Sequence, residues 1–166
     1  VPANITVSAT SAAGAVVNYT ATASDNVGVT SSSCSPASGS TFTIGTATVT
    51  CTAADAAGNT GTASFTVTVE DTTPPNLTMP ADITLDPTSA AGAVVNYTAS
   101  ATDNVGLATF GCVPASGSTF AIGTTTVTCT ATDVAGNTAT ATFTVTVEDT
   151  TPPNLTMPAD ITLDPT

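Results

Sequence analysis

The chain has 166 residues, of which 12 are acidic and none is Lys, Arg or His, so its formal net charge is −12. This composition argues against a nucleic-acid partner, because phosphate binding depends on Lys or Arg to release counterions. No apolar run approaches the length of a transmembrane helix, so we expect no membrane insertion. The apolar residues are mostly small, with five Phe, two Tyr and no Trp, which favours small cores over one large core.

The predicted elements are all β-strands. Apolar and polar residues alternate along Val17–Ala23, Thr46–Thr52 and Phe65–Val69, with Thr on the outward face. The clusters SAAGA, SDNVG, SPASGS, DAAGN and DTTPP separate these segments and are typical of turns. Short strands with regular turns predict an immunoglobulin-like β-sandwich.

The same elements occur twice, because the sequence repeats itself at an offset of 78 residues. Asn18 returns as Asn96 (96 − 18 = 78), and Cys34 returns as Cys112. The unit is longer than solenoid repeats, so each copy is expected to be a domain with its own core. The predicted organisation is repeat 1 at 1–70, a Pro-rich linker at 71–75, repeat 2 at 76–148, a second linker at 149–153, and the first strand of a truncated repeat 3 at 154–166. Two successive prolines in each linker stiffen it, which predicts a linear, rod-like array.

The four cysteines have identical spacing in the two copies. They lack a CxxC motif, and no His is present, so a zinc site is not indicated. We predict the disulfides Cys34–Cys51 and Cys112–Cys129, each closing a loop of about 16 residues that contributes about 3 kcal/mol in the chain-entropy model. Disulfides place the chain in an oxidising, extracellular setting, either secreted or on the cell surface.

The run CSPASGSTFTIGTATVTCTAADAAGNTGTASFTVTVEDTTPP, at residues 34–75, resembles the hyalin repeat (HYR) family of immunoglobulin-like extracellular modules. The resemblance covers both complete copies and implies an adhesion or structural role. Members of that family often carry a second disulfide. The corresponding positions here are Val1 or Met79 and Ala63 or Ala141, so both ends of that bridge are missing together.

The acidic residues suggest a Ca²⁺ site between repeats. In an immunoglobulin-like sandwich, the loops that hold Asp25 and Asp55 share one end with the entering chain. Oxygen ligands on adaptable loops suit Ca²⁺, and similar DTTPP and DxxGN segments mark calcium-stiffened junctions in bacterial immunoglobulin-like repeats. The predicted ligands and their equivalents are Glu70, Asp71, Asp103, Asn104, Asp133 and Asn137, with Asp25, Asp55, Glu148 and Asp149. The alternative is that the loop aspartates only close Asx turns.

Covalent glycans are a second expectation. Five Asn-x-Thr sequons begin at Asn4, Asn18, Asn76, Asn96 and Asn154. Such triplets also arise by chance in Thr-rich sequence. Glycans would protect exposed strand edges in a chain that has no Lys to guard them.

No catalytic role is expected, because the chain lacks His and Lys and its acids recur mostly in turns. No organic cofactor is expected either. The near-identical copies and the boundary that falls within a repeat instead favour the stalk or shaft of a surface adhesin or fibre, a window of a longer array whose partners are neighbouring repeats or identical subunits.

Three alternatives remain. One is a glycan- or protein-binding module that uses the divergent segments 29–35 and 107–113, and another is a non-catalytic spacer in a large secreted enzyme. The third is that residues 154–166 dock as a strand on another subunit. The first copy has its own equivalent at 1–10, which favours continuation into a further repeat.

Overall fold

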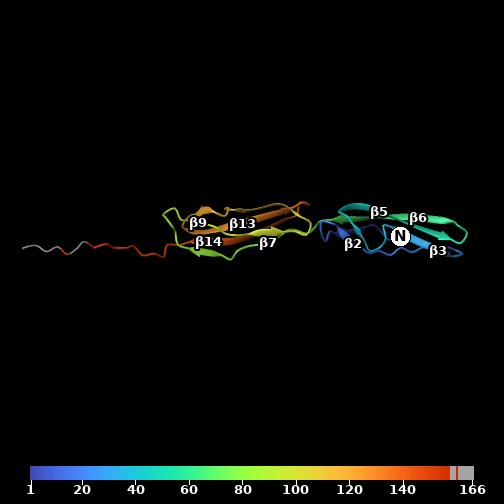
Figure 1. Cartoon of the computed structure of the whole chain (residues 1–166), viewed down its shortest axis with the longest axis horizontal. Helices are drawn as coiled ribbons and strands as arrows, with labels where there is room; N and C mark the ends of the chain where they lie inside the picture. Colours follow the sequence, from blue (N-terminus) through green and yellow to red (C-terminus); the bar gives the residue numbers. More distant parts are fainter. Residues whose placement is uncertain (158–159, 161–166) are drawn as a thin grey trace, which may run out of the picture.

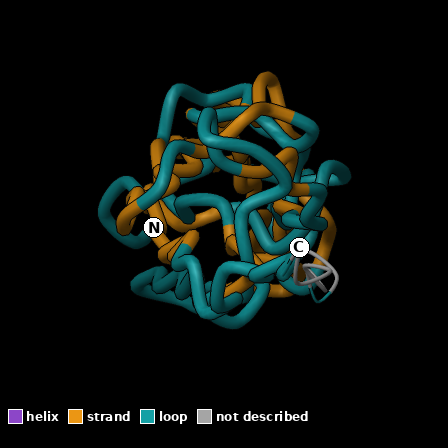
Figure 2. Tube along the Cα trace, turned by 90° about the vertical axis from the view of Figure 1, so that its left-hand side faces the viewer, coloured by secondary structure: helices purple, strands orange, loops and turns teal. Residues whose placement is uncertain are grey.

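The structure, a computed structural model, describes residues 1–157 and 160. The described residues form fourteen β-strands and no helix, and they build two sandwiches joined end to end along one axis (Figure 1). Seen along that axis, the strands and loops of both sandwiches overlap within one rounded outline (Figure 2). The predicted all-β, rod-like arrangement of immunoglobulin-like sandwiches is therefore confirmed. No helix in the described part of the chain is long and apolar enough to cross a membrane.

The first sandwich consists of a four-stranded sheet that faces a two-stranded one. The larger sheet has the order β1 (Ile5–Ser8), β6 (Thr60–Glu70), β5 (Gly45–Asp55), β3 (Val29–Ser35). In this sheet β1 runs parallel to β6, and the other neighbours are antiparallel. The smaller sheet pairs β2 (Ala15–Val17) with β4 (Ser40–Phe42).

The second sandwich repeats this plan and adds one strand pair. Its larger sheet has the order β8 (Ile83–Leu85), β14 (Thr138–Val147), β13 (Gly123–Asp133), β11 (Leu107–Val113). The smaller sheet pairs β9 (Ala93–Val95) with β12 (Ser118–Phe120). The additional pair is β7 (Asn76–Thr78) with β10 (Ser100–Thr102), which has no counterpart among the described strands of the first sandwich.

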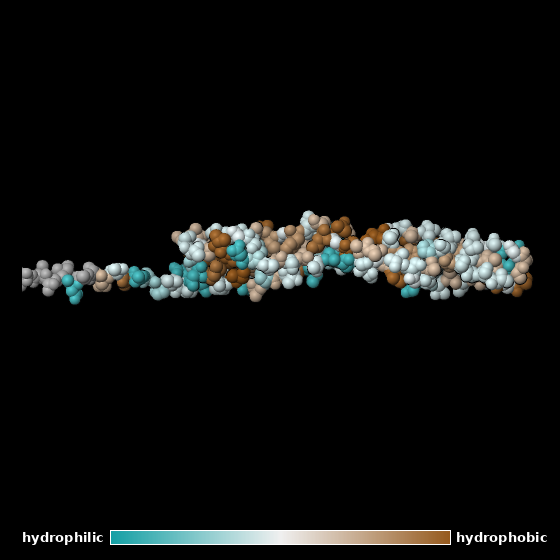
Figure 3. Space-filling model, in the orientation of Figure 1, coloured by the Kyte–Doolittle hydropathy of each residue, from teal (hydrophilic) through white to brown (hydrophobic). Residues whose placement is uncertain are grey.

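Alternation along the strands explains both cores. Along β6, Phe65, Val67 and Val69 are buried, whereas the Thr residues between them are only half-buried. The Phe65 ring packs edge-to-face on Tyr19, with ring centroids 5.0 Å apart. The visible outer surface is mostly of intermediate hydropathy, with apolar residues in separate small groups (Figure 3). Each sandwich therefore has its own small core, as the composition predicts.

The strands predicted at Thr46–Thr52 and Phe65–Val69 are confirmed, since they lie within β5 and β6. The strand predicted at Val17–Ala23 is wrong beyond Val17, where β2 ends. Residues 18–23 still alternate between exposed and half-buried positions down to Thr22, but they form no ladder. The sequence pattern records which side chains face inward, whereas a ladder also needs a neighbouring strand.

Both predicted disulfides are present. Cys34 and Cys51 face each other across β3 and β5, and Cys112 and Cys129 do the same across β11 and β13. Each bridge therefore joins two adjacent strands of one sheet rather than the two sheets of a sandwich. The described cysteines include no free thiol.

Candidate metal site at the junction between the sandwiches

The junction begins where β6 leaves the first sandwich. Val69 points into the first core and is 1% exposed, Glu70 points outward, and Asp71 points inward again with 8% of its surface exposed. The period of two along an extended chain thus sends Asp71, and not Glu70, into the junction. The Asp71 Oδ1 accepts a hydrogen bond of 3.2 Å from the Thr73 backbone N–H.

The loop between β10 and β11 brings the second group of polar atoms. Asp103 Oδ1 accepts hydrogen bonds from the backbone N–H groups of Val105 and Gly106, at 2.8 and 2.9 Å. Asn104 Nδ2 donates a 2.9 Å hydrogen bond to the carbonyl oxygen of Ala9 in the first sandwich. Val105 packs against the apolar core of the first sandwich. This loop therefore joins the two sandwiches by polar and apolar contacts.

The loop between β13 and β14 brings the third group. Asp133 is 2% exposed, and its Oδ1 accepts backbone hydrogen bonds from Ala135 at 2.9 Å and Asn137 at 2.8 Å. Asn137 Nδ2 donates both to Asp133 Oδ2 at 2.8 Å and to the Asp71 carbonyl oxygen at 3.0 Å. Burial, the largest influence, raises the pKa of Asp133, but the hydrogen bonds from Asn137, Ala135 and Gly136 together bring the pKa below its ordinary value. Asp133 is therefore a carboxylate at neutral pH.

These three segments converge on one point. Asp71, Asp103 and Asp133 each offer a carboxylate oxygen, and the three oxygens lie within 4.8 Å of one another. Three buried oxygen atoms at the junction have no hydrogen-bond partner: Asp71 Oδ2, Asp103 Oδ2 and Asn104 Oδ1. Buried polar atoms normally find a partner, because leaving one unpaired costs about 1–3 kcal/mol, and more for a charged group.

The donor set fits a hard divalent cation. All the converging atoms are oxygens, and carboxylate and amide oxygens are the ligands that Ca²⁺ takes in proteins. No cysteine thiolate is available as a ligand, since all four cysteines form disulfides. A cation would neutralise carboxylates that the chain has no Lys, Arg or His to balance.

The remaining predicted ligands lie elsewhere. Glu70, Glu148 and Asp149 are exposed and do not belong to the converging group. Asp55 ends β5 at the end of the first sandwich where β6 begins, opposite the end where β6 leaves for the junction, and Asp25 lines the same surface hollow as Asp55. Each closes an Asx turn, with Asp25 accepting from the Val27 N–H and Asp55 from the Ala57 N–H, both at 2.9 Å. The loop aspartates therefore close turns in both copies. Among the described residues, three carboxylates also converge where the linker meets the second sandwich.

Two contributors to the junction were not apparent in the sequence, namely the Ala9 carbonyl and the Val105 side chain. The inward direction of Asp71 could have been read from its parity with Val67 and Val69. The sequons are all accessible, since Asn4, Asn18, Asn76, Asn96 and Asn154 are exposed. Whether they carry glycans stays a prediction.

Fold and junction together define a class: tandem, disulfide-stabilised, immunoglobulin-like sandwiches joined by an acidic contact. A family model for the HYR domain matches residues 1–69 and 70–147, so the chain belongs to the HYR domain family. It is also similar to proteins named hyalin, at 42% identity over 157 residues in Lytechinus variegatus and 41% over 155 residues in Strongylocentrotus purpuratus. Both alignments cover 87% of this chain but only 29% and 13% of the relatives, respectively.

The family places the chain among extracellular or cell-surface repeat modules of the adhesion type, a class of non-enzymatic domains. The disulfides agree with that setting. The family match changes from one domain to the next between residues 69 and 70. The domain and linker boundaries predicted from the sequence stay predictions.

Proposed function

We propose that this chain is a stiff, non-catalytic segment of the stalk or shaft of an extracellular adhesin or fibre, and that Ca²⁺ stiffens it at the junction between sandwiches. The observation that carries the proposal is the convergence of Asp71, Asp103 and Asp133 from the linker and from two loops. A ligand that bridges these segments fixes the angle between the sandwiches, because Asp71 directly follows β6 of the first sandwich, whereas Asp103 and Asp133 belong to the second.

Electrostatics support a bound cation. Two unit charges 4 Å apart repel by about 4 kcal/mol at an effective dielectric constant of 20, a value suited to sites near a protein surface. Asp71 and Asp133 are almost fully buried, so water screens them less than exposed acids. Without a cation, this repulsion pushes the linker away from the loops. When a cation is bound, each carboxylate is attracted to it, so the cation holds the linker to the loops.

The apolar and polar contacts support stiffness independently of the metal. Val105 packs on the first core, Asn104 binds the Ala9 carbonyl, and Pro75 in the linker is buried. Pro74 and Pro75 also fix the backbone of the linker. These contacts hold the two sandwiches in a fixed orientation, so the segment is extended and stiff, as a stalk or shaft requires.

The experiment that tests the calcium site is thermal unfolding of dilute protein in EDTA and in excess CaCl₂. A free Ca²⁺ concentration of 100 times the dissociation constant raises the free energy of unfolding by about 2.7 kcal/mol, which raises the Tm by about 10 °C or more in domains of this size. The variant Asp103→Asn should lose most of this shift, because it removes one negative charge and keeps the oxygen that closes the turn.

The matched control is Asp25→Asn, the same substitution at the equivalent position of the first sandwich. Asp25 closes the same kind of turn, but it lies outside the converging group. This control should keep the full calcium shift in dilute solution. An equal shift in Asp103→Asn, or no shift in the unsubstituted chain at millimolar Ca²⁺, would contradict the proposed site.

A second candidate function is recognition of a glycan or protein, supported by one local difference between the copies. Phe110 on β11 is 39% exposed and lines a surface cavity with Tyr97, whereas Ser32 occupies the equivalent place in the first sandwich. Loss of partner binding in Phe110→Ser, with unchanged Tm and calcium response, would favour this function. The role of a spacer in a larger secreted enzyme also fits a non-catalytic rod.

A further inference from the structure

In the second sandwich, a strand near the point where the chain enters lies beside the strand from which it leaves. The chain enters this sandwich at the end that meets the first sandwich and leaves it at the opposite end (Figure 1). The early strand β8 and the last strand β14 are neighbours in the larger sheet. They pair in parallel, with Ile83 opposite Val145 and Leu85 opposite Val147. Tension along the rod therefore pulls the start of β8 and the end of β14 in opposite directions.

The parallel pairing decides how this ladder responds to tension. Force along the strands makes them slide past each other, so it loads all the residue pairs of the ladder at once. Force across the strands would instead open a ladder from one end, one pair at a time. The first sandwich has the same arrangement, since β1 runs parallel to β6, with Ile5 opposite Val67 and Ser8 opposite Glu70. In both sandwiches the ladder is therefore loaded in shear, the direction in which it resists most.

Two aspartates extend the short ladder of the second sandwich beyond both ends of β8. Before β8, Asp82 Oδ1 accepts a 2.7 Å hydrogen bond from the Thr144 backbone N–H. After β8, Asp86 Oδ1 accepts hydrogen bonds from the Thr150 backbone N–H at 2.8 Å and from the Thr150 hydroxyl at 2.7 Å. These two bonds hold the pKa of Asp86 below its ordinary value, so its carboxylate is charged at neutral pH. The aspartates therefore tie the entering segment to the leaving one on both sides of the ladder.

The first sandwich has contacts at the same places, but they are neutral. The equivalents of the two aspartates are Asn4 and Ser8. Asn4 Oδ1 accepts a 3.0 Å hydrogen bond from the Thr66 backbone N–H, and the Ser8 hydroxyl shares a hydrogen bond with the Thr72 hydroxyl. Hydrogen bonds to an ionised acceptor are about twice as strong as neutral ones. The second sandwich therefore carries the stronger form of a contact that both sandwiches have.

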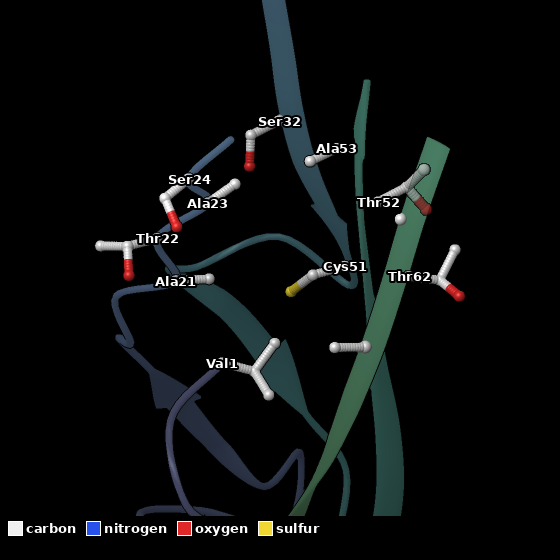
Figure 4. A pocket seen from close by; sticks show the side chains of 12 residues that line it. Val1, Ala21, Thr22, Ala23, Ser24, Ser32, Cys51, Thr52, Ala53 and Thr62 are labelled. Carbon is white, nitrogen blue, oxygen red and sulfur yellow. The ribbon is translucent and has the colours of Figure 1, made fainter. Parts of the chain in front are cut away.

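The disulfides do not carry this load. One bridge joins β3 to β5 and the other joins β11 to β13, so neither connects an entering strand to a leaving one. In the first sandwich, Cys51 on β5 points into a surface hollow of about 230 Å³ that Val1 and Ala21 also line (Figure 4). The resistance of the entering and leaving strands to separation therefore comes from noncovalent contacts.

We propose that β8, β14 and the hydrogen bonds of Asp82 and Asp86 form a mechanical clamp, which keeps the second sandwich folded when the rod is under tension. Tension reaches β7 first, but β7 pairs with β10 and not with the strand that leaves. The clamp is the direct connection between the entering and leaving segments, so the sandwich unfolds only when the whole clamp breaks. The use of this clamp rests on the proposed stalk function, which places the chain under tension, whereas its geometry does not.

Unfolding of single molecules at constant force, in EDTA, tests the clamp. Handles joined to peptide tags at the two ends of the chain pull along the rod, and the two sandwiches unfold in two steps. Asp86→Ala should raise the unfolding rate of one sandwich by about tenfold or more at the same force, because two hydrogen bonds to a charged group are lost. The other step should keep its rate. An Asp86→Ala variant that unfolds like the unsubstituted chain overturns the proposal.

The matched control is Ser116→Ala, which also removes two hydrogen bonds from the second sandwich. Ser116 Oγ accepts from the Tyr97 backbone N–H at 2.9 Å and donates to the Tyr97 carbonyl oxygen at 2.8 Å. Ser116 lies between β11 and β12, outside the β8–β14 ladder. This control should lower the Tm of the dilute protein, as Asp86→Ala does, but keep the unfolding rate under force. Equal acceleration in the two variants would show that general stability sets the rate, and would overturn the clamp.

A change of pulling direction tests the shear geometry. In the double variant Ile122→Cys and Asp149→Cys, thiol-directed handles attach next to Gly123 and Val147, which face each other where β13 begins and β14 ends. The native cysteines do not react, because they are bridged. Tension between these handles opens the β13–β14 ladder one pair at a time. At the same force, unfolding should be faster than along the rod by about tenfold or more, and equal rates would contradict loading in shear.

The clamp and the calcium site can fail separately. Unfolding under force in EDTA reports the clamp without any bound cation, whereas the calcium shift in the Tm of dilute protein reports the junction without any force. A calcium shift in a chain whose Asp86→Ala variant resists force normally would leave the junction proposal standing and overturn the clamp. Faster unfolding of Asp86→Ala in a chain without a calcium shift would support the clamp and contradict the calcium site.

Discussion

Asn104 Nδ2 donates a hydrogen bond to the carbonyl oxygen of Ala9, the residue that follows β1, so a loop of the second sandwich is tied to the first sandwich 95 residues earlier in the chain. Asn26, at the equivalent position of the first sandwich, is exposed. The two asparagines occupy equivalent positions in their sandwiches, but of the two only Asn104 contacts the other sandwich.

Replacing Asn104 by Ala should therefore loosen the junction without unfolding either sandwich. The net contribution of such a hydrogen bond is about 0.5–1.5 kcal/mol. We expect the two sandwiches to tumble more independently, measured by ¹⁵N relaxation in EDTA, with each Tm nearly unchanged. Asn26→Ala should leave the relaxation unchanged, and equal effects of the two substitutions would refute a specific role for Asn104.

A second prediction concerns a close backbone approach in each sandwich. Gly14 has a φ of +105°, and a Cβ at this position would lie 1.9 Å from the Phe42 carbonyl oxygen. Gly92 has the same relationship to Phe120, with a φ of +109° and a distance of 1.8 Å. Alanine at either site forces backbone to move in addition to adopting a strained φ.

We therefore expect Gly14→Ala to destabilise the first sandwich by about 3 kcal/mol or more, which calorimetry would record as a fall in Tm of more than about 10 °C. The control is Gly61→Ala, at a position on β6 with no atom within 4 Å and no positive φ. This control should be neutral or slightly stabilising, by up to about 1 kcal/mol. Similar losses in both variants would argue against the steric explanation.

Most of the fold followed from local patterns. Alternating Thr and Val along 65–69, the turn clusters and the cysteine spacing identify strands and bridges, because each depends on residues close in sequence. The approach of Asp71, Asp103 and Asp133 was also predictable, since the loops at one end of an immunoglobulin-like sandwich are known from strand order. Glu70 was also predicted as a ligand, although the alternation that turns Asp71 inward turns Glu70 outward.

What the sequence could not reveal depends on neighbours. Residues 18–23 have the pattern of a strand, yet in the first sandwich no described segment pairs with them. Residues 100–102, at the positions equivalent to 22–24, do form a strand, because β7 pairs with them.

The disulfides should stabilise each sandwich separately. Each bridge spans 17 positions, for which the chain-entropy model gives about 3 kcal/mol. Replacing Cys34 and Cys51 together by Ala should lower the Tm of the first sandwich by about 10 °C or more and leave the second transition in place. Replacing Cys112 and Cys129 should do the reverse, with a larger loss because Cys129 is fully buried whereas Cys51 is 8% exposed. A single shared transition that moves equally in both variants would contradict independent cores.

Acid should destabilise the chain, because hydrogen bonds in the folded state lower the pKa of several aspartates. Hydrogen bonds from Val27 and Gly28 lower the pKa of Asp25, those from Asn59 lower the pKa of Asp55, and those from Thr150 lower the pKa of Asp86. A carboxyl group whose pKa is lower in the folded state stabilises the fold above its unfolded pKa of about 3.9, and this stabilisation is lost as the pH falls through the folded pKa. In EDTA and physiological salt, which limits repulsion between distant acids, the Tm should be flat near neutral pH and fall below about pH 4.

The double variant Asp25→Asn and Asp55→Asn separates this effect from the loss of net charge. Asparagine keeps an oxygen that accepts the turn hydrogen bonds but does not titrate, so the acid slope of the first sandwich should become shallower while that of the second persists. If acid raised the Tm of the unsubstituted chain, relief of repulsion among the 12 acids would be the larger effect, and the turn hydrogen bonds would not govern its pH dependence.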